Sequence, residues 1–151
     1  MSEVVDFPVL LQNTFFTRFV VIPVAGHDPD KHQSLNLPMN NRIRMEVVDE
    51  VAGEYALVMR TILNEEEDPV DPYHIDIECV VVFKAVPGKD LLEVKKAVGI
   101  TGHSIAYGAI REAVAWVTGR SAYPPLLLGI SVLKKPTPPV DPPQEETPSP
   151  N

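Results

Sequence analysis

Apolar and polar positions alternate with a period of two along the first two-thirds of the chain, as is typical of β-strands. The alternation is clearest in YHIDIECVVVFKAV, residues 73–86, where every second side chain is apolar. Aromatic and β-branched residues dominate 14–24, and two further alternating stretches, 42–47 and 55–63, flank a turn. We therefore predict four strands, the middle two forming a hairpin. Their one-sided pattern indicates an antiparallel sheet with one buried face.

A long polar connection separates the first strand from the hairpin, and helices follow the last strand. The connection, residues 26–41, is GHDPDKHQSLNLPMNN. A short helix is predicted over 90–98 and, after the link Gly-Ile-Thr-Gly, a long helix over 103–118, which Gly119 ends. Four strands followed by two helices indicate an α+β fold, in which a long crossover joins two strands of the four-stranded antiparallel sheet and both helices pack on one face.

The end of the chain has a different composition. From Pro136 the sequence is PTPPVDPPQEETPSPN, which is rich in proline and nearly free of aliphatic residues. Such a segment buries too little apolar surface to offset the entropy lost on ordering. We predict one folded domain over residues 7–133 and a disordered, acidic, proline-rich tail over 136–151.

The predicted long helix is apolar on more than one side, whereas a surface helix normally has a single apolar stripe. A stripe of large residues lies beside a stripe of alanines. We therefore predict a homo-oligomer that buries this helix between two sheets. The interface would comprise Ala106, Ala109, Ala113, Ile110, Val114 and Val117. The alternative is a helix that its own chain covers completely.

Composition narrows the class of partner. The chain has 151 residues and a net charge of -8, with 44% hydrophobic and 23% charged residues. An acidic chain is a poor match for nucleic acid or for an anionic membrane surface. The lone cysteine, Cys79, allows no internal disulfide, and no apolar run reaches the ~20 residues of a membrane span. The acidic N-terminus does not resemble a signal peptide, so we expect a cytoplasmic protein.

The end of the long helix and the residues after it resemble the SecB protein-export chaperone family. The family's marker is an Arg-Glu pair, an Arg, an aromatic-Pro pair and alternating leucines, which here are Arg111-Glu112, Arg120, Tyr123-Pro124, Leu126 and Leu128. The resemblance covers residues 10–133. It implies a homotetramer, a dimer of dimers assembled through the long helix and the sheet edges. It also implies ATP-independent holding of unfolded preproteins for translocation, and their transfer to the SecA motor.

Two departures from the family pattern leave the pathway open. Gly108, Ala109 and Ile110 stand where the family usually has Pro-Tyr-Ala. The family's last helix, which helps to contact SecA, is replaced by ISVLKKPTPP, and Pro136 stops any helix there. SecB-like proteins also serve as chaperones of toxin–antitoxin pairs. A SecB-like adaptor for one specific protein partner is therefore the alternative to a general preprotein chaperone.

A holding chaperone needs apolar surface that stays accessible. The candidate client-binding residues come from the second strand, the connection before it and the segment after the helix: Ile43, Met45, Val47, Leu35, Leu37, Met39, Tyr123, Leu126 and Leu128. Two carboxylates on the polar face of the fourth strand, Asp76 and Glu78, could meet a basic partner such as SecA. For both sets the alternative is ordinary core or a solvated face.

Other chemistry is weakly represented. HDPDKH, residues 27–32, contains metal-ligand residue types at no standard spacing, and we predict a polar turn there and no metal. His103 and Ser104 are adjacent at a predicted helix start and lack a nucleophile elbow. Phosphate and dinucleotide motifs are missing from the sequence, so no cofactor and no enzymatic activity are predicted. A metal-dependent enzyme using residues 27–32 remains a third, weaker hypothesis.

Overall fold

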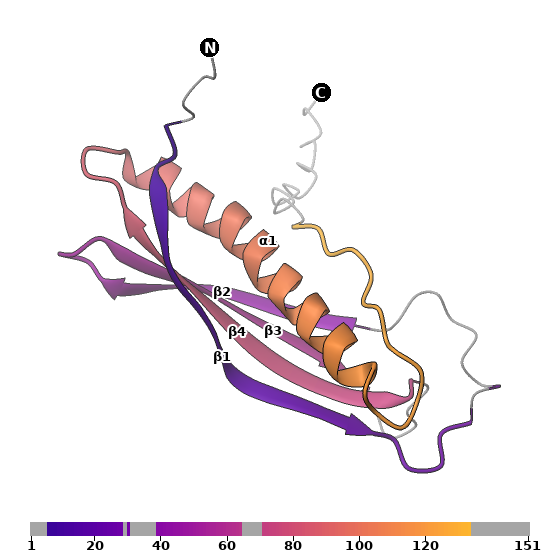
Figure 1. Ribbon diagram of the computed structural model, residues 1–151. Helices are drawn as coiled ribbons and strands as arrows, with labels where there is room; N and C mark the ends of the chain where they lie inside the picture. The colour runs from indigo at the N-terminus through magenta and orange to yellow at the C-terminus, as the bar shows by residue number, and fades with distance from the viewer. Residues whose placement is uncertain (1–5, 29, 31–38, 65–70, 134–151) are drawn as a thin grey trace, which may run out of the picture.

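One antiparallel sheet with a single long helix across it makes up the fold (Figure 1). The computed structural model describes residues 6–28, 30, 39–64 and 71–133. The strand order is β1-β4-β3-β2, and the elements are β1 (Val9–Pro23), β2 (Met39–Asp49), β3 (Glu54–Leu63), β4 (Tyr73–Ala85) and α1 (Leu91–Thr118). The predicted α+β class, the antiparallel sheet and the hairpin of β2 and β3 are confirmed. Since β1 and β2 are the two edge strands, the connection between them has to cross the width of the sheet.

The helical region differs from the prediction. We expected two helices separated by a link at residues 99–102, whereas α1 is one continuous helix of 28 residues. The link was predicted because two glycines occur within four residues. Gly102 instead marks a close approach of the helix to the sheet, since a Cβ atom there would lie 2.9 Å from the Cβ of Leu57 and 3.2 Å from the ring of Phe83. Packing on the sheet thus outweighs the helix propensity of glycine, which is about 1 kcal/mol poorer than that of alanine.

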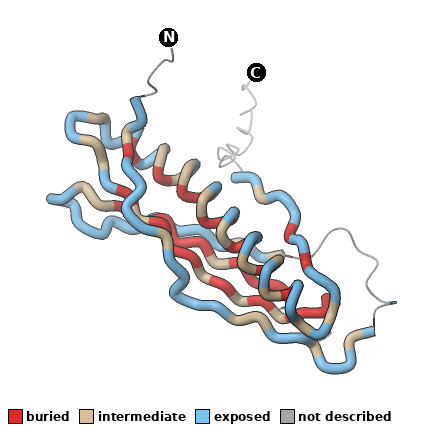
Figure 2. The backbone as a smooth tube through the Cα atoms, viewed as in Figure 1, coloured by how far each residue is buried: buried red, intermediate tan, exposed pale blue. Residues whose placement is uncertain are grey.

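The core lies between α1 and one face of the sheet (Figure 2). The alternation predicted for the fourth strand is confirmed, because all its inward side chains are buried: Tyr73, Ile75, Ile77, Cys79, Val81 and Phe83. The helix contributes a matching row of buried side chains, which includes Val94, Val98, Ala106, Ile110 and Val114. Burial raises the pKa of the Cys79 thiol to about 11, as expected for an unreactive core cysteine.

Two strands are longer than predicted, and β1 is irregular. It begins at Val9 rather than at residue 14, and β2 begins at Met39 rather than at residue 42. The pairing of β1 with β4 shifts register twice, between Leu11 and Asn13 and between Phe16 and Arg18. These shifts are bulges, which change the face that later side chains occupy. In the described part of the chain, α1 is the single helix, and it does not meet the length and hydropathy of a membrane span.

Candidate functional site

A groove of about 490 Å³ runs between α1 and the edge strand β1. Its walls are apolar except for Glu112, and they comprise Phe16 and Phe19 from β1 with Ala109, Ala113, Trp116 and Val117 from α1. The rings of Phe16 and Phe19 meet edge to face with centroids 5.4 Å apart. Trp116 is 60% exposed, and the guanidinium carbon of Arg120 lies 4.4 Å from its ring centroid. An apolar groove beside an edge strand is a surface suited to a protein partner.

The two phenylalanines of this groove were missed in the sequence because they are three residues apart. Strict alternation would place them on opposite faces of the sheet. The bulge at Thr17 inserts one extra residue, so that Phe16 pairs with Cys79 and Phe19 pairs with Ile77, both of which face α1. A bulge has no reliable sequence signature here, and only strand pairing identifies it.

The predicted interface residues on α1 divide into two groups. Ala106, Ile110 and Val114 are fully buried against the subunit's own sheet, which corrects the expectation that they lie at a subunit interface. Ala109, Ala113 and Val117 are only partly buried and line the β1-side groove. The flank of α1 beside β1 is therefore incompletely covered, and it carries two of the three alanines of the predicted small-residue stripe.

The opposite flank of α1 exposes apolar side chains of β2. Ile43, Met45 and Val47 pair with Met59, Leu57 and Tyr55, so they share the face that α1 covers. They are nevertheless 39%, 40% and 55% exposed. The methyl group of Met45 would lie 3.8 Å from a Cβ at Gly99, which places this row beside the first half of α1. Of the predicted crossover residues, Met39 is partly buried against the core, and Leu35 and Leu37 lie outside the described residues.

The segment after α1, residues 124–133, runs back along the helix and is called the strap below (Figure 1). Leu126 and Leu128 are buried core side chains, which corrects the expectation that they line an exposed groove. The Leu126 amide donates to the Thr118 hydroxyl at 2.9 Å. Arg111 Nε donates to the Leu128 carbonyl at 3.0 Å, and the Tyr107 hydroxyl donates to the Gly129 carbonyl at 2.7 Å.

A chain of polar groups ties the strap to both α1 and β2. The Thr61 hydroxyl donates to Asn41 Oδ1 at 2.8 Å, and Asn41 Nδ2 donates to Ser131 Oγ at 3.2 Å. Ser131 Oγ lies 3.1 Å from Nε2 of the buried His103. Because Asn41 already donates to the Ser131 oxygen, the Ser131 proton is available for His103 Nε2. Burial lowers the pKa of His103, so the ring favours the neutral form that can accept it.

Tyr123, predicted as a client-binding residue, joins three segments. Its hydroxyl donates to the Val24 carbonyl at 2.6 Å, and its own carbonyl accepts from the Tyr73 hydroxyl at 2.7 Å. Its ring packs edge to face on His27, with centroids 5.4 Å apart. Tyr123 therefore fastens the end of α1 to the start of the connection between β1 and β2. In residues 27–32, the Asp28 carboxylate accepts from the Asp30 amide at 3.0 Å, as in a turn, and His32 lies outside the described residues.

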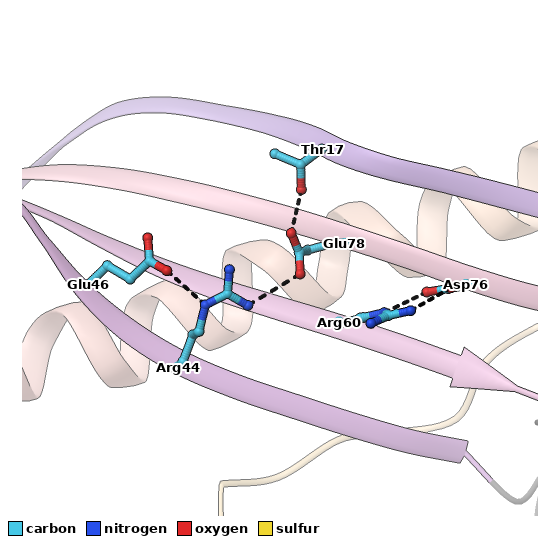
Figure 3. Close-up of polar contacts among 6 residues, drawn as sticks. All are labelled: Thr17, Arg44, Glu46, Arg60, Asp76 and Glu78. Atoms are coloured by element: carbon cyan, nitrogen blue, oxygen red, sulfur yellow. Dashed lines mark hydrogen bonds and ion pairs between the residues drawn. The ribbon is translucent and has the colours of Figure 1, made fainter.

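The two carboxylates of the predicted partner-contact face have cationic partners within the chain (Figure 3). Asp76 binds Arg60 and Arg18, and Glu78 accepts from Arg44 at 3.3 Å and from the Thr17 hydroxyl at 2.7 Å. The pKa of Asp76 is lowered mainly by its hydrogen bonds from Arg60, and less by Arg18. The pKa of Glu78 is lowered mainly by the hydrogen bond from Thr17, and less by Arg44. A basic partner would have to displace these arginines.

The same contacts cover a second apolar cluster. Ala56, Val58 and Val80 are buried on the sheet face away from α1, with Val82 packed against them. Arg44 pairs with Val58 across the sheet, so its side chain has to pass over β3 to reach Glu78 on β4. Long arginine side chains can shield apolar surface in this way while their charge stays in water.

The comparisons with known proteins give a likeness of fold. Neither a protein-family model nor a curated protein matches the chain. Among solved structures, the chain is similar to the SecB-like chaperone Rv1957 of Mycobacterium tuberculosis, which was solved with a peptide from the HigA1 antitoxin. The TM-score is 0.61 and the identity 21%, over 82% of this chain and 91% of that chain. A protein of unknown function from Streptococcus agalactiae matches at a TM-score of 0.46 and 11% identity, over 81% of this chain and 97% of that one.

The four-stranded antiparallel sheet with a long helix on one face is the fold expected from the sequence resemblance, and the structural match agrees with it. The chain has the fold of the SecB-like chaperones.

Proposed function

We propose that the protein is a non-enzymatic, ATP-independent chaperone that holds unfolded segments of client proteins. The observation that carries this proposal is the apolar row Ile43, Met45 and Val47, which faces the core side of the sheet yet stays at least 39% exposed. A folded protein rarely leaves such a row open unless a ligand covers it. Methionine suits a surface that accepts varied sequences, because its side chain is unbranched and adaptable.

The net charge of -8 fits the same role. Charge repulsion between particles keeps a protein with exposed apolar grooves in solution. A client that remains unfolded would touch the row by many shallow contacts, which together give avidity without sequence specificity.

The alternative is a chaperone dedicated to one protein partner. In its support, the similar structure from Mycobacterium tuberculosis contains a peptide from an antitoxin. Export through SecA has less support, because Asp76 and Glu78 are engaged by arginines within the chain. Both alternatives use the apolar row on β2, and neither includes a chemical step. Both also fit a protein that works in the cytoplasm.

We further propose that the β1-side groove receives a second copy of the chain. Phe16, Phe19 and Trp116 are each more than 40% exposed beside the free edge of β1, and the alanines of α1 allow another backbone to approach closely. Pairing of two such edges would extend the sheet and cover the rings, and the second exposed flank would remain for clients. A dimer of dimers is the assembly that the SecB resemblance implies.

The experiment is an aggregation assay with a chemically denatured model protein diluted into buffer. We expect the purified protein to suppress light scattering at a stoichiometric ratio, without nucleotide. Unchanged aggregation at a several-fold excess would refute a general holding activity. Deletion of 136–151 then separates the alternatives: a general chaperone keeps its activity, whereas an adaptor that recruits its partner through the tail loses that partner.

A further inference from the structure

We propose that Tyr107 and His103, which continue along α1 from Arg111, form a recognition row for the main chain of an extended apolar segment, and that residues 129–133 of the strap occupy this row until a client segment replaces them. Arg111 keeps its bond to the buried Leu128 and fixes the point from which the strap is released. The inference deepens the proposed holding function and rests on it. It names the residues of α1 that take part in client binding on the β2 flank, the chemistry of their ligand and a segment of the chain that competes for them.

The three residues lie on one face of the helix, because they are spaced by four. Two of them bind main-chain carbonyls: Arg111 Nε contacts the Leu128 oxygen at 3.0 Å and the Tyr107 hydroxyl contacts the Gly129 oxygen at 2.7 Å. His103 Nε2 meets the Ser131 hydroxyl at 3.1 Å. Every peptide segment has carbonyls that Tyr107 can bind and N–H groups that the neutral His103 Nε2 can accept from. The row can therefore hold the main chain of an extended segment regardless of its sequence.

The strap has a first part that buried side chains anchor, up to Leu128, and a largely exposed second part, residues 129–133. Leu126 and Leu128 are buried in the core. Beyond them Ile130 and Val132 are 86% and 75% exposed, and hollows of about 210 Å³ and 320 Å³ separate this part of the strap from α1. His103 and Ser131 line both hollows. Residues 129–133 are therefore held by a few polar contacts and by the less exposed Leu133, so their displacement costs less than that of Leu126 and Leu128.

The row continues into the exposed apolar surface of β2. Asn41, which holds Ser131, lies on the same face of β2 as Ile43 and Met45, two and four residues further along. A client segment that replaced the strap beside His103 would reach these side chains without turning. The ligand that fits is consequently an extended, apolar stretch of polypeptide, bound by its main chain on α1 and by side chains on β2.

The test uses the full chain and a fluorescein-labelled peptide with this chain's own sequence from 126 to 135, LLLGISVLKK. Ser131→Ala removes the contacts to Asn41 and His103 from the strap and leaves the row intact. We expect it to bind the peptide about three- to tenfold more tightly than the wild type, in line with the loss of one or two hydrogen bonds from the competitor. The matched control is Ser121→Ala just beyond the end of α1, whose hydroxyl donates to the Val117 carbonyl at 2.8 Å and which lines neither hollow. It should bind like the wild type.

Adding Tyr107→Phe to Ser131→Ala tests the main-chain part of the proposal. In Ser131→Ala the strap is already largely released, so Tyr107→Phe removes a donor mainly from the bound peptide and the double variant should lose the gain in affinity. Circular dichroism melting checks that both variants are folded. Equal peptide affinity of wild type and Ser131→Ala, or a gain that survives Tyr107→Phe, would overturn the inference.

A second variant locks the strap. In N41C/S131C the two new thiols replace side chains that touch at 3.2 Å. The native Cys79 is buried and does not compete for oxidation. We expect the oxidised protein, verified by mass, to bind the peptide at least tenfold more weakly than the same protein after reduction. Oxidised and reduced forms of equal affinity would contradict displacement.

The outcomes separate this inference from the proposed function. If wild type and Ser131→Ala both suppress aggregation and bind the peptide equally, the chaperone function stands and the strap is not a competitor. If Ser131→Ala gains peptide affinity and neither protein suppresses aggregation, the row and strap are correct and the general holding activity is wrong.

Discussion

Arg60 on β3 donates two hydrogen bonds of 2.7 Å to Asp76 on β4, one to each carboxylate oxygen. Arg18 on β1 adds a third at 2.6 Å. One carboxylate thus links three neighbouring strands on the sheet face that α1 leaves open. The residue was predicted as a contact for a basic partner, and the structure gives it a role inside the subunit.

Asp76→Asn should lower the free energy of unfolding at pH 7 by about 1–2 kcal/mol, because charge-assisted hydrogen bonds to a mostly buried carboxylate are lost. The lowered pKa of Asp76 means that its contribution is present above its unfolded pKa and is lost as the pH falls through the folded one. The difference between wild type and variant should therefore shrink below about pH 4. Urea denaturation at pH 7 and at pH 3 measures it, and a difference that stays constant would contradict the assignment.

The buried His103 should make the stability of the fold depend on pH in a second range. Burial lowers its pKa, so the unfolded chain takes up the proton first when the pH falls below about 6.5, and stability drops with it. The groups that face the His103 ring are neutral: the Ser131 hydroxyl of the strap, which Asn41 of β2 contacts in turn, and the stacked ring of Tyr107. The charged Arg111 lies two helical turns further along α1. Stability measured by urea should fall from pH 7.5 to pH 5.5 in the wild type and fall less in His103→Gln. Parallel curves would exclude His103 as the cause.

Two glycines of α1 offer a matched pair of alanine substitutions. At Gly102 an added Cβ would meet Leu57 at 2.9 Å and Phe83 at 3.2 Å, so Gly102→Ala should cost about 1–3 kcal/mol through overpacking. At Gly108 nothing lies within 4 Å, so Gly108→Ala should stabilise the subunit by about 0.5–1 kcal/mol through helix propensity. Thermal unfolding of both variants provides the comparison. Destabilisation by Gly108→Ala would indicate that another chain packs there.

Ala113→Glu tests the assembly. The residue lines the β1-side groove and is only partly buried, so the subunit can tolerate a glutamate that a second copy cannot. A tetramer has a mass of about 67 kDa, four times the 16.7 kDa of the chain, and the variant should give a smaller mass by light scattering with an unchanged circular dichroism spectrum. The control Ser104→Glu adds the same charge on an exposed part of α1 outside this groove and should keep the wild-type mass. A wild-type mass near that of one chain would reject the oligomer.

Met45→Glu tests the client surface. The side chain is 40% exposed, so a charge there should leave the fold intact while it repels the apolar segments of a client. Suppression of aggregation should fall several-fold. Ile22→Glu is the control, because it also replaces an exposed apolar residue, 54% exposed on β1, which is the edge strand opposite β2. Equal loss in both variants would show that general surface hydrophobicity, and not the β2 row, holds clients.

Much of the fold follows from the period of the apolar residues. In β4 six alternating side chains from Tyr73 to Phe83 face the helix, as their pattern predicted. A strand with one buried face has to place its apolar positions on that face and its polar positions on the other, so the pattern determines the orientation. The candidate site was less predictable. Ile43, Met45 and Val47 were assigned to the correct face, whereas Leu126 and Leu128 were expected in an exposed groove and are core residues.

The sequence by itself determined the class of the fold, the hairpin and the inner faces of strands and helix, because these depend on local periodicity and on the need to bury apolar side chains. Only the tertiary structure decided that α1 is continuous, since the close approach of Gly102 to Leu57 compensates for its poor helix propensity. It also decided that a bulge brings Phe16 and Phe19 to one face, and that the strap returns along His103, Tyr107 and Arg111. These features depend on contacts between segments far apart in the chain, which no local pattern records.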